Sequence, residues 1–167
     1  PNELRISVRR IHLEGTSFKQ ICTESNYNEE KIKQKIIDII IRRGKLHNPV
    51  TDTGGLAFGT VEEIGEEFYN PQNLKVGDTI ICNASQIENI LAIDHVFNQI
   101  DASGYAILHD HVPIIKIEED MPVNLLLYTL DESGTLYRLS QLAEGQSKFL
   151  IVGNNMITNL IFGYVIR

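Results

Sequence analysis

The chain has no tryptophan, only two cysteines and no basic segment that could neutralise a run of phosphates. Its 22 acidic residues outnumber its 15 lysines and arginines, which gives a formal net charge of −7. A protein of this charge is not expected to bind nucleic acid. Cys22 and Cys82 are too few for a disulfide framework or a four-thiolate zinc site, and we expect two reduced thiols.

Long apolar segments are also missing. No run approaches the roughly 18 apolar residues that cross a bilayer, and no charged-then-apolar leader opens the chain. We therefore expect no membrane partner and a cytoplasmic location. The 43% of hydrophobic residues in a chain of 167 is enough to build one sizeable core.

The first residues predict a half-buried strand followed by a short helix. Leu4, Ile6 and Val8 alternate with polar residues, as they would on one face of a strand from about residue 3 to 11. A turn follows, after which Thr16 or Ser17 is the expected cap of a helix that ends near residue 22.

Residues 28–43 carry the clearest helical pattern. Acidic residues open this segment, Arg42 and Arg43 close it, and Gly44 follows as the expected C-cap. The isoleucines expected on the buried face are Ile32, Ile36, Ile37, Ile40 and Ile41.

Short strands dominate the middle of the chain, at residues 56–64, 79–82, 90–93, 105–109 and 114–117. Gly77 provides a turn before the second of them, and residues 101–104 are interpreted as another turn. Pro122 opens a helix, and residues 148–153 and 155–167 predict a buried strand and a helix. The fold class is mainly β with α, that is α+β, with the short strands arranged as a barrel or sandwich.

Three segments carry a family resemblance. The first is the run Arg-Gly-Lys-Leu-His-Asn-Pro-Val-Thr at residues 43–51 with the glycine-rich residues 54–65 after it, and the second is the Val-Gly-Asp turn at 76–78. The third consists of residues 104–108 together with Leu130, Asp131 and Gly134. They resemble the medium-chain dehydrogenases, and among these a lysine-fermentation branch that oxidises a small diamino acid. The resemblance implies an oxidoreductase with a GroES-like substrate-binding barrel at residues 1–121, bridging helices at 122–147, and the first strand and helix of a Rossmann-like domain at 148–167.

The same resemblance places the substrate at the polar turn that follows Gly44. The implied substrate-binding residues are Asn48, Thr51, Asp52, Thr53 and Ser17. Asp52 would pair with a substrate ammonium group, and His47 or Asp131 would act as the base. The alternatives are that His47 and Asn48 only cap the preceding helix and satisfy backbone groups, and that Asp131 and Glu132 are solvated acids at a helix break.

The expected cofactor is NAD or NADP, held at Gly153 and Asn155. The family pattern G-x-G-x-x-G would fall on residues 153–158, where Asn155 and Thr158 replace two glycines and would crowd a pyrophosphate. Zinc-dependent members keep a His-Glu pair where this chain has Gly55 and Leu56, and neither residue can bind a metal. We predict no zinc.

Other clusters leave alternatives open. Arg42, Arg43 and Lys45 could attract a carboxylate or could simply complement the helix dipole. His109 and His111 could bind a metal but fit solvated residues at a strand end better. As a whole, the chain is an enzyme's substrate-binding half, a non-catalytic scaffold of the same descent, or a fragment of a longer protein. Unpaired apolar strands predict a homodimer.

Overall fold

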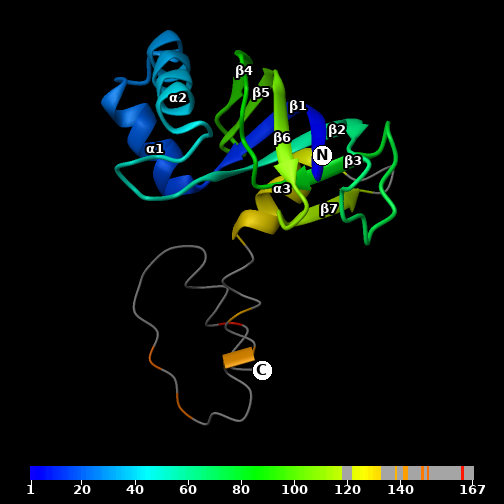
Figure 1. Ribbon diagram of the computed structural model, residues 1–167. Coiled ribbons are helices and arrows are strands. Elements are labelled where there is room, and N and C mark those ends of the chain that lie inside the picture. The colour runs from blue at the N-terminus through cyan, green and yellow to red at the C-terminus, as the bar shows by residue number, and fades with distance from the viewer. Residues whose placement is uncertain are drawn as a thin grey trace. The chain divides into compact units, whose positions relative to one another are not determined.

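The computed structural model describes residues 1–117 and 122–132, together with positions 138, 141, 142, 148, 150 and 163. The chain divides into two compact units, Pro1–Tyr128 and Thr129–Arg167. In the first unit a seven-stranded antiparallel sheet is accompanied by a pair of helices (Figure 1). The mainly β fold with helices confirms the α+β class. The strand and helix expected at residues 148–167 lie outside the described residues.

The sheet is organised around β1 (Glu3–Leu13), the first and longest strand. Along one edge β1 pairs with β2 (Gly55–Ile64). Its other edge is shared by β6 (Tyr105–His109), which pairs with the first half of β1, and β5 (Gln99–Ser103), which pairs with the second half. The remaining strands are β3 (Thr79–Cys82), β4 (Asn89–Asp94) and β7 (Ile114–Ile117). The order along the sheet is β4-β5-β1-β2-β3-β7.

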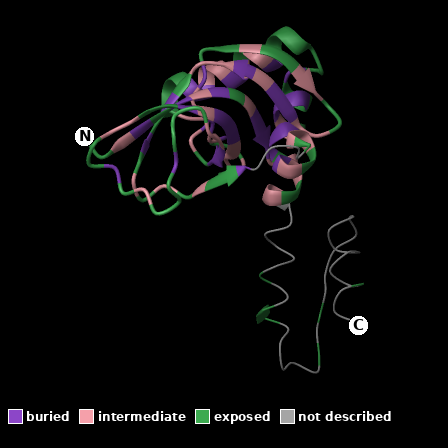
Figure 2. Cartoon of the chain, turned by 90° about the vertical axis from the view of Figure 1, so that its right-hand side faces the viewer, coloured by how far each residue is buried: buried purple, intermediate pink, exposed green. Residues whose placement is uncertain are grey.

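Burial along β1 follows the alternation predicted from the sequence. Leu4, Ile6 and Val8 are at most 1% exposed, whereas Arg5 and Arg9 lie in solvent. The buried residues of the sheet, purple in Figure 2, form one core with buried residues of the two helices that lie between β1 and β2 in the chain. β1 extends two residues beyond its predicted end, so that its final residues pair with β2 near the start of that strand.

β5 is a correction to the sequence analysis, which interpreted residues 101–104 as a turn. Asp101, Ala102 and Ser103 pair with β4 in a strand that ends at Gly104. At this glycine, which has φ +149°, an added Cβ would lie 2.6 Å from the backbone nitrogen of Glu88. Gly104 therefore lets the chain leave β5 and continue directly into β6.

α1 (Gly15–Glu24) is also capped differently from the prediction. The carboxylate of Glu14 accepts hydrogen bonds from the backbone nitrogens of Thr16 and Ser17, at 2.9 and 3.0 Å. Neither Thr16 nor Ser17 is the cap, because both lie inside the first turn and donate to it. The acidic cap suits the positive end of the helix dipole.

α2 (Glu29–Arg43) confirms the predicted helix, with Asn28 as its N-cap and Gly44 as its C-cap at φ +78°. The predicted buried face is correct for Ile32, Ile36 and Ile40. Ile41 is 74% exposed, and Ile39 is buried in its place at 7% exposure. The helix therefore packs with a slightly rotated face.

α3 (Val123–Glu132) begins one residue after Pro122, whose carbonyl accepts a hydrogen bond from the backbone nitrogen of Leu126. The Tyr128 ring makes edge contacts with the His12 and Phe97 rings. In the part of the chain that the structure describes, no helix is long and apolar enough to cross a membrane.

Candidate functional site

The polar turn after α2 is a small hairpin closed by Asn48 and Thr53. These two residues form an isolated antiparallel bridge, in which the Asn48 nitrogen donates to the Thr53 carbonyl at 2.8 Å. The Asp52 nitrogen donates to the Asn48 carbonyl at 2.9 Å, and Asp52 takes a left-handed conformation with φ +56°. The hairpin therefore presents its polar side chains in one fixed arrangement, directly before β2.

Asn48 anchors this hairpin to α1. Its side chain is buried, and its amide nitrogen donates to Ser17 Oγ at 2.9 Å and to Gln20 Oε1 at 2.8 Å. Its amide oxygen accepts from the Val50 nitrogen at 3.0 Å. Two predicted substrate-binding residues, Asn48 and Ser17, are thus brought together as structural support, and a direct substrate contact from either one stays a prediction.

The threonines form a second attachment. The hydroxyls of Thr51 and Thr53 form a hydrogen bond with each other at 2.9 Å. Thr53 Oγ1 also donates a hydrogen bond to Glu14 Oε2 at 3.3 Å. Burial raises the pKa of Glu14, but hydrogen bonds from Thr16, Ser17 and Thr53 outweigh it and hold that pKa below its ordinary value. The ionised Glu14 therefore caps α1 and holds the hairpin at once.

His47 and Asp52 face each other across the hairpin, with 2.9 Å between His47 Nε2 and Asp52 Oδ1. The hydrogen bond from His47 is the main cause of a lowered pKa at Asp52, and the charge of Arg43 lowers it further. Because an ionised carboxylate only accepts, Nε2 carries the proton in neutral His47, and Nδ1 keeps the lone pair. The His47 side chain is 28% exposed and that of Asp52 is 91% exposed, so solvent or a ligand can reach the pair.

The residues before the hairpin are held from the other side. The Leu46 nitrogen donates to the Ser85 carbonyl at 3.0 Å, and Ser85 Oγ donates to the Leu46 carbonyl at 3.2 Å. Leu46 and Ser85 are both fully or almost fully buried. The alternative interpretation is correct in part: Gly44, and neither His47 nor Asn48, caps α2, but the Asn48 side chain does satisfy a backbone group, the Val50 nitrogen.

The described structure does not test the remaining predicted residues. Asp131 lies half-buried near the end of α3, in the second unit, and its role as a base stays a prediction. Gly153 and Asn155, the predicted cofactor residues, lie outside the described residues.

Other metal or nucleophile candidates offer little. His109 and His111 stack at 6.0 Å between ring centroids, near Glu3 and Asp110 respectively. Within the described ranges no three His, Cys, Asp or Glu side chains are grouped so as to hold a metal. Both cysteines are free and buried, and burial raises the pKa of Cys22 and raises that of Cys82 to about 11.

Sequence reasoning missed three residues that shape this region: Glu14, Ser85 and Lys35. Glu14 stands directly before a glycine at a helix start, a position where an acid can cap, and this signal could have found it. Lys35 lies seven residues before Arg42 on the same helix face. Ser85 had no such signal, because its contact with Leu46 spans 39 residues of sequence.

Comparison with known proteins gives a consistent answer. Residues 1–118 match the family model described as the L-erythro-3,5-diaminohexanoate dehydrogenase N-terminal domain. A protein of Fusobacterium nucleatum subsp. nucleatum with the name L-erythro-3,5-diaminohexanoate dehydrogenase is 34% identical over 98% of this chain and 49% of its own length. A protein of the same name from Acetoanaerobium sticklandii is 35% identical over 91% of this chain and 46% of its own length.

The chain thus spans about half the length of these curated relatives. The family model covers the whole sheet and the hairpin at residues 48–53. The chain belongs to the L-erythro-3,5-diaminohexanoate dehydrogenase N-terminal domain family.

Proposed function

We propose that this chain is the substrate-binding half of an NAD(P)-dependent, zinc-independent dehydrogenase that oxidises a small diamino acid such as L-erythro-3,5-diaminohexanoate. The observation that carries the proposal is the exposed His47–Asp52 pair on an anchored hairpin, in a chain that belongs to this family. A carboxylate and an imidazole are the two groups that oxidation of an ammonium-bearing carbon requires: one to hold a cation and one to accept a proton.

We assign the domains accordingly. Residues 1–121 are the GroES-like substrate domain, residues 122–147 bridge, and residues 148–167 begin a Rossmann-like domain. The seven-stranded antiparallel sheet around β1 supports the first assignment. The other two rest on the sequence, as does the assignment of Gly153 and Asn155 to NAD or NADP.

Asp52 can serve both partners because it has two carboxylate oxygens. Oδ1 accepts the hydrogen bond from His47, and Oδ2 is available to hold a substrate ammonium group. The contact with Asp52 fixes the His47 ring and its tautomer, so that Nδ1 is the atom that accepts a proton. The hairpin keeps both groups in place before the substrate arrives.

The reaction removes a proton from the substrate nitrogen and a hydride from the carbon that bears it. His47 Nδ1 takes the proton, which frees the nitrogen lone pair to expel the hydride and form an iminium ion. A nicotinamide cofactor, when bound, supplies the acceptor for that hydride. Water then hydrolyses the iminium ion to a ketone and an ammonium ion, so that atoms and charge balance.

Zinc independence is supported by the backbone at Gly55. A Cβ at this position would lie 2.2 Å from the His12 carbonyl oxygen, so β1 and β2 would have to move apart to admit any side chain. The histidine that zinc-dependent relatives of the implied superfamily keep here would have no room. Leu56, the next residue, has no atom that binds a metal.

The proposal is tested with the full-length gene product and L-erythro-3,5-diaminohexanoate, by following reduction of NAD⁺ and NADP⁺. Wild type is expected to turn over. His47→Gln should lower kcat by about 100-fold or more, since general base catalysis contributes at least this much. Asp52→Asn should raise KM, because the substrate ammonium loses its charged partner.

His111→Gln is the matched control, because it removes an exposed histidine from the turn after β6 and should leave both constants unchanged. Absence of turnover in wild type at high enzyme concentration would refute the proposal, and would favour a non-catalytic scaffold if the protein also failed to bind NAD(H). Full activity in His47→Gln would remove His47 as the base and leave Asp131 to be tested.

A further inference from the structure

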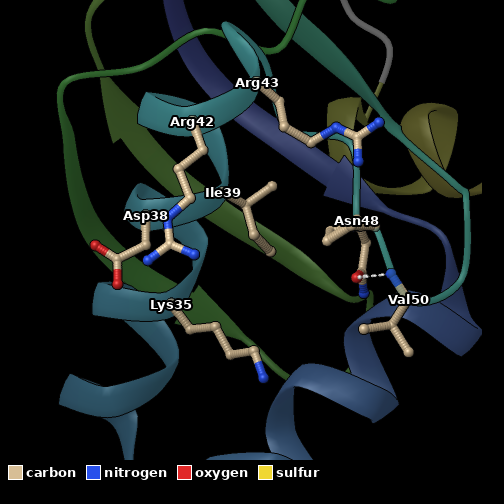
Figure 3. A pocket seen from close by; sticks show the side chains of 8 residues that line it. Lys35, Asp38, Ile39, Arg42, Arg43, Asn48 and Val50 are labelled. Atoms are coloured by element: carbon tan, nitrogen blue, oxygen red, sulfur yellow. Dashed lines mark hydrogen bonds between the residues drawn. The ribbon is translucent and has the colours of Figure 1, made fainter.

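A pocket of about 250 Å³ lies beside the hairpin, between the second half of α2 and residues 48–50 (Figure 3). Lys35, Ile39 and Arg42 recur along one face of α2 and form one wall with Asp38 and Arg43. The opposite wall consists of Asn48, Pro49 and Val50, which the hydrogen bonds of Asn48 hold against α1. Both walls therefore belong to well-supported elements.

The pocket is cationic although the chain as a whole is acidic. Lys35, Arg42 and Arg43 face a single acid, Asp38, in a protein with a net charge of −7. Lys35 pairs with Glu24, and Asp38 accepts a hydrogen bond from Gln34. Arg42 and Arg43 are exposed and make no ion pair with another described residue, so two guanidinium groups remain available.

The negative end of the α2 dipole can balance only part of the positive charge of Arg42 and Arg43. The helix dipole places about half a negative charge at that end, which is less than the charge of two arginines. Guanidinium groups bind carboxylates through two parallel hydrogen bonds, and hold them better than ammonium groups do. The surplus charge therefore fits an anion with a planar carboxylate.

The pocket also has an apolar side. Ile39 contributes its buried side chain, and Pro49 and Val50 expose theirs, with Val50 63% exposed. Such a wall suits methylene groups, which gain from leaving water. Together the two sides favour a carboxylate on a short aliphatic chain over inorganic phosphate.

The pocket and the His47–Asp52 pair share the same hairpin. Asn48 and Val50 line the pocket while Asp52 closes the turn between Asn48 and Thr53. Arg43 lines the pocket and is near enough to Asp52 for its charge to act on that carboxylate. A cationic region and an anionic region therefore lie next to each other, as the two ends of an amino acid require.

We propose that the pocket at Arg42, Arg43 and Val50 is the subsite for the carboxylate of the diamino acid, while Asp52 holds an ammonium group of the same molecule. This inference rests on the proposed function and adds the feature that selects an amino acid over a plain diamine. It gives Arg42 and Arg43 the role of specificity-determining residues.

The test compares two substrates in the full-length enzyme: 3,5-diaminohexanoate, and pentane-2,4-diamine, which lacks the carboxylate. The double variant Arg42→Gln/Arg43→Gln should raise KM for the diamino acid by about 10- to 100-fold, as expected for a lost charged hydrogen bond. Its kcat and its constants for the diamine should stay within about twofold of wild type. Lys31→Gln, an exposed position on the same helix, controls for the loss of charge.

A second measurement separates the two proposals. Hexanoate is titrated into the protein, and the backbone amide signals of Asn48 and Val50 are followed by NMR. Saturable shifts in wild type that vanish in the double variant support the carboxylate subsite even if no substrate is oxidised, an outcome that would defeat only the proposed function. An active wild type whose double variant keeps its KM, or an absence of hexanoate shifts, would overturn the subsite.

Discussion

Asn48 carries more of the site's geometry than any of the groups that face solvent. Its buried amide connects Ser17 and Gln20 of α1 to the backbone of Val50, and its main chain closes the hairpin with Thr53. Buried amides are costly when they lose partners, so all these bonds act together. The position of the exposed His47–Asp52 pair therefore depends on Asn48, which is itself buried.

Replacing Asn48 with alanine should therefore destabilise the fold as well as the site. Ser17, which is buried, and Gln20, which is half-buried, would lose their donor, and we expect a loss of about 2–4 kcal/mol in the free energy of unfolding. Urea denaturation followed by circular dichroism measures the change. Asn83→Ala, at an exposed asparagine, should change stability by less than about 0.5 kcal/mol. Equal stability of both variants would show that the amide network contributes nothing.

The sequence could predict the contiguous part of this site but not its support. His47, Asn48, Asp52 and Thr53 lie within one short segment, and a polar turn after a helix was enough to bring them together. The bonds from Asn48 to Ser17 and from Thr53 to Glu14 span 31 and 39 residues. Local patterns contain no information on such pairs, because they depend on how α1 and the hairpin pack.

Among the elements, β2 is the one that begins under the tightest steric constraint. Gly55 pairs with Leu13 at the end of β1, where an added Cβ would lie 2.2 Å from the His12 carbonyl oxygen. Gly54, its neighbour, has more room: an added Cβ would lie 3.4 Å from the Leu46 carbonyl, an ordinary contact. The close approach of the β1 backbone therefore explains why a glycine stands at position 55, and no need for flexibility has to be assumed.

Gly55→Ala is accordingly expected to lower the free energy of unfolding by about 2 kcal/mol or more, because β1 and β2 must move apart to relieve the overlap. Gly54→Ala, the matched control, should cost about 1 kcal/mol at most. Thermal unfolding of the two variants beside wild type gives the comparison. A Gly55→Ala protein as stable as Gly54→Ala would mean that the sheet adjusts easily at this point, and would remove the steric argument against a histidine there.

The sequence predicted other elements unevenly, and the reasons are physical. β3, β6 and β7 have the bounds expected from their apolar runs, since each lies between clear turn residues. β5 was missed because Asp101, Ser103 and Gly104 are typical of turns, whereas pairing with β4 and β1 decides their conformation. Ile39 is buried instead of Ile41 because α2 has six isoleucines, three of them consecutive at 39–41, and their spacing alone does not decide which of these three face the core.

At the scale of the molecule, the end strands of the sheet bear on association, and the acidic residues bear on stability. β4 and β7 close the pairing order at its two ends and expose Leu91 and Ile115, at 65% and 45%. Apolar side chains on end strands are compatible with association, and the homodimer stays a prediction. The acidic charge acts on stability through those carboxylates that gain partners on folding.

In the described part of the chain, such partners lower the pKa of three carboxylates, those of Glu14, Asp52 and Asp78. Hydrogen bonds hold the pKa of Glu14 below its ordinary value of 4.5 despite burial, which raises it. The hydrogen bond from His47 lowers the pKa of Asp52 from 3.8, and that from Lys116, 2.6 Å away, lowers the pKa of Asp78 from the same value. In each case the folded protein binds its proton less readily than the unfolded chain.

The protein should therefore lose stability in acid. Because the unfolded chain takes up protons first, the stabilisation is fully present above about pH 5, begins to fall near the unfolded pKa values of about 4 to 4.5, and is lost as the pH drops through the lower folded values. The urea midpoint measured from pH 7 to pH 3 is expected to decrease over that lower range.

Glu14→Gln keeps an oxygen that can accept from Thr16 and Ser17 but has no carboxylate that binds a proton, so its midpoint should fall less steeply than that of wild type. A wild-type midpoint that stays constant or rises between pH 5 and pH 3 would contradict the role of these carboxylates, and a parallel decline in Glu14→Gln would remove Glu14 from it.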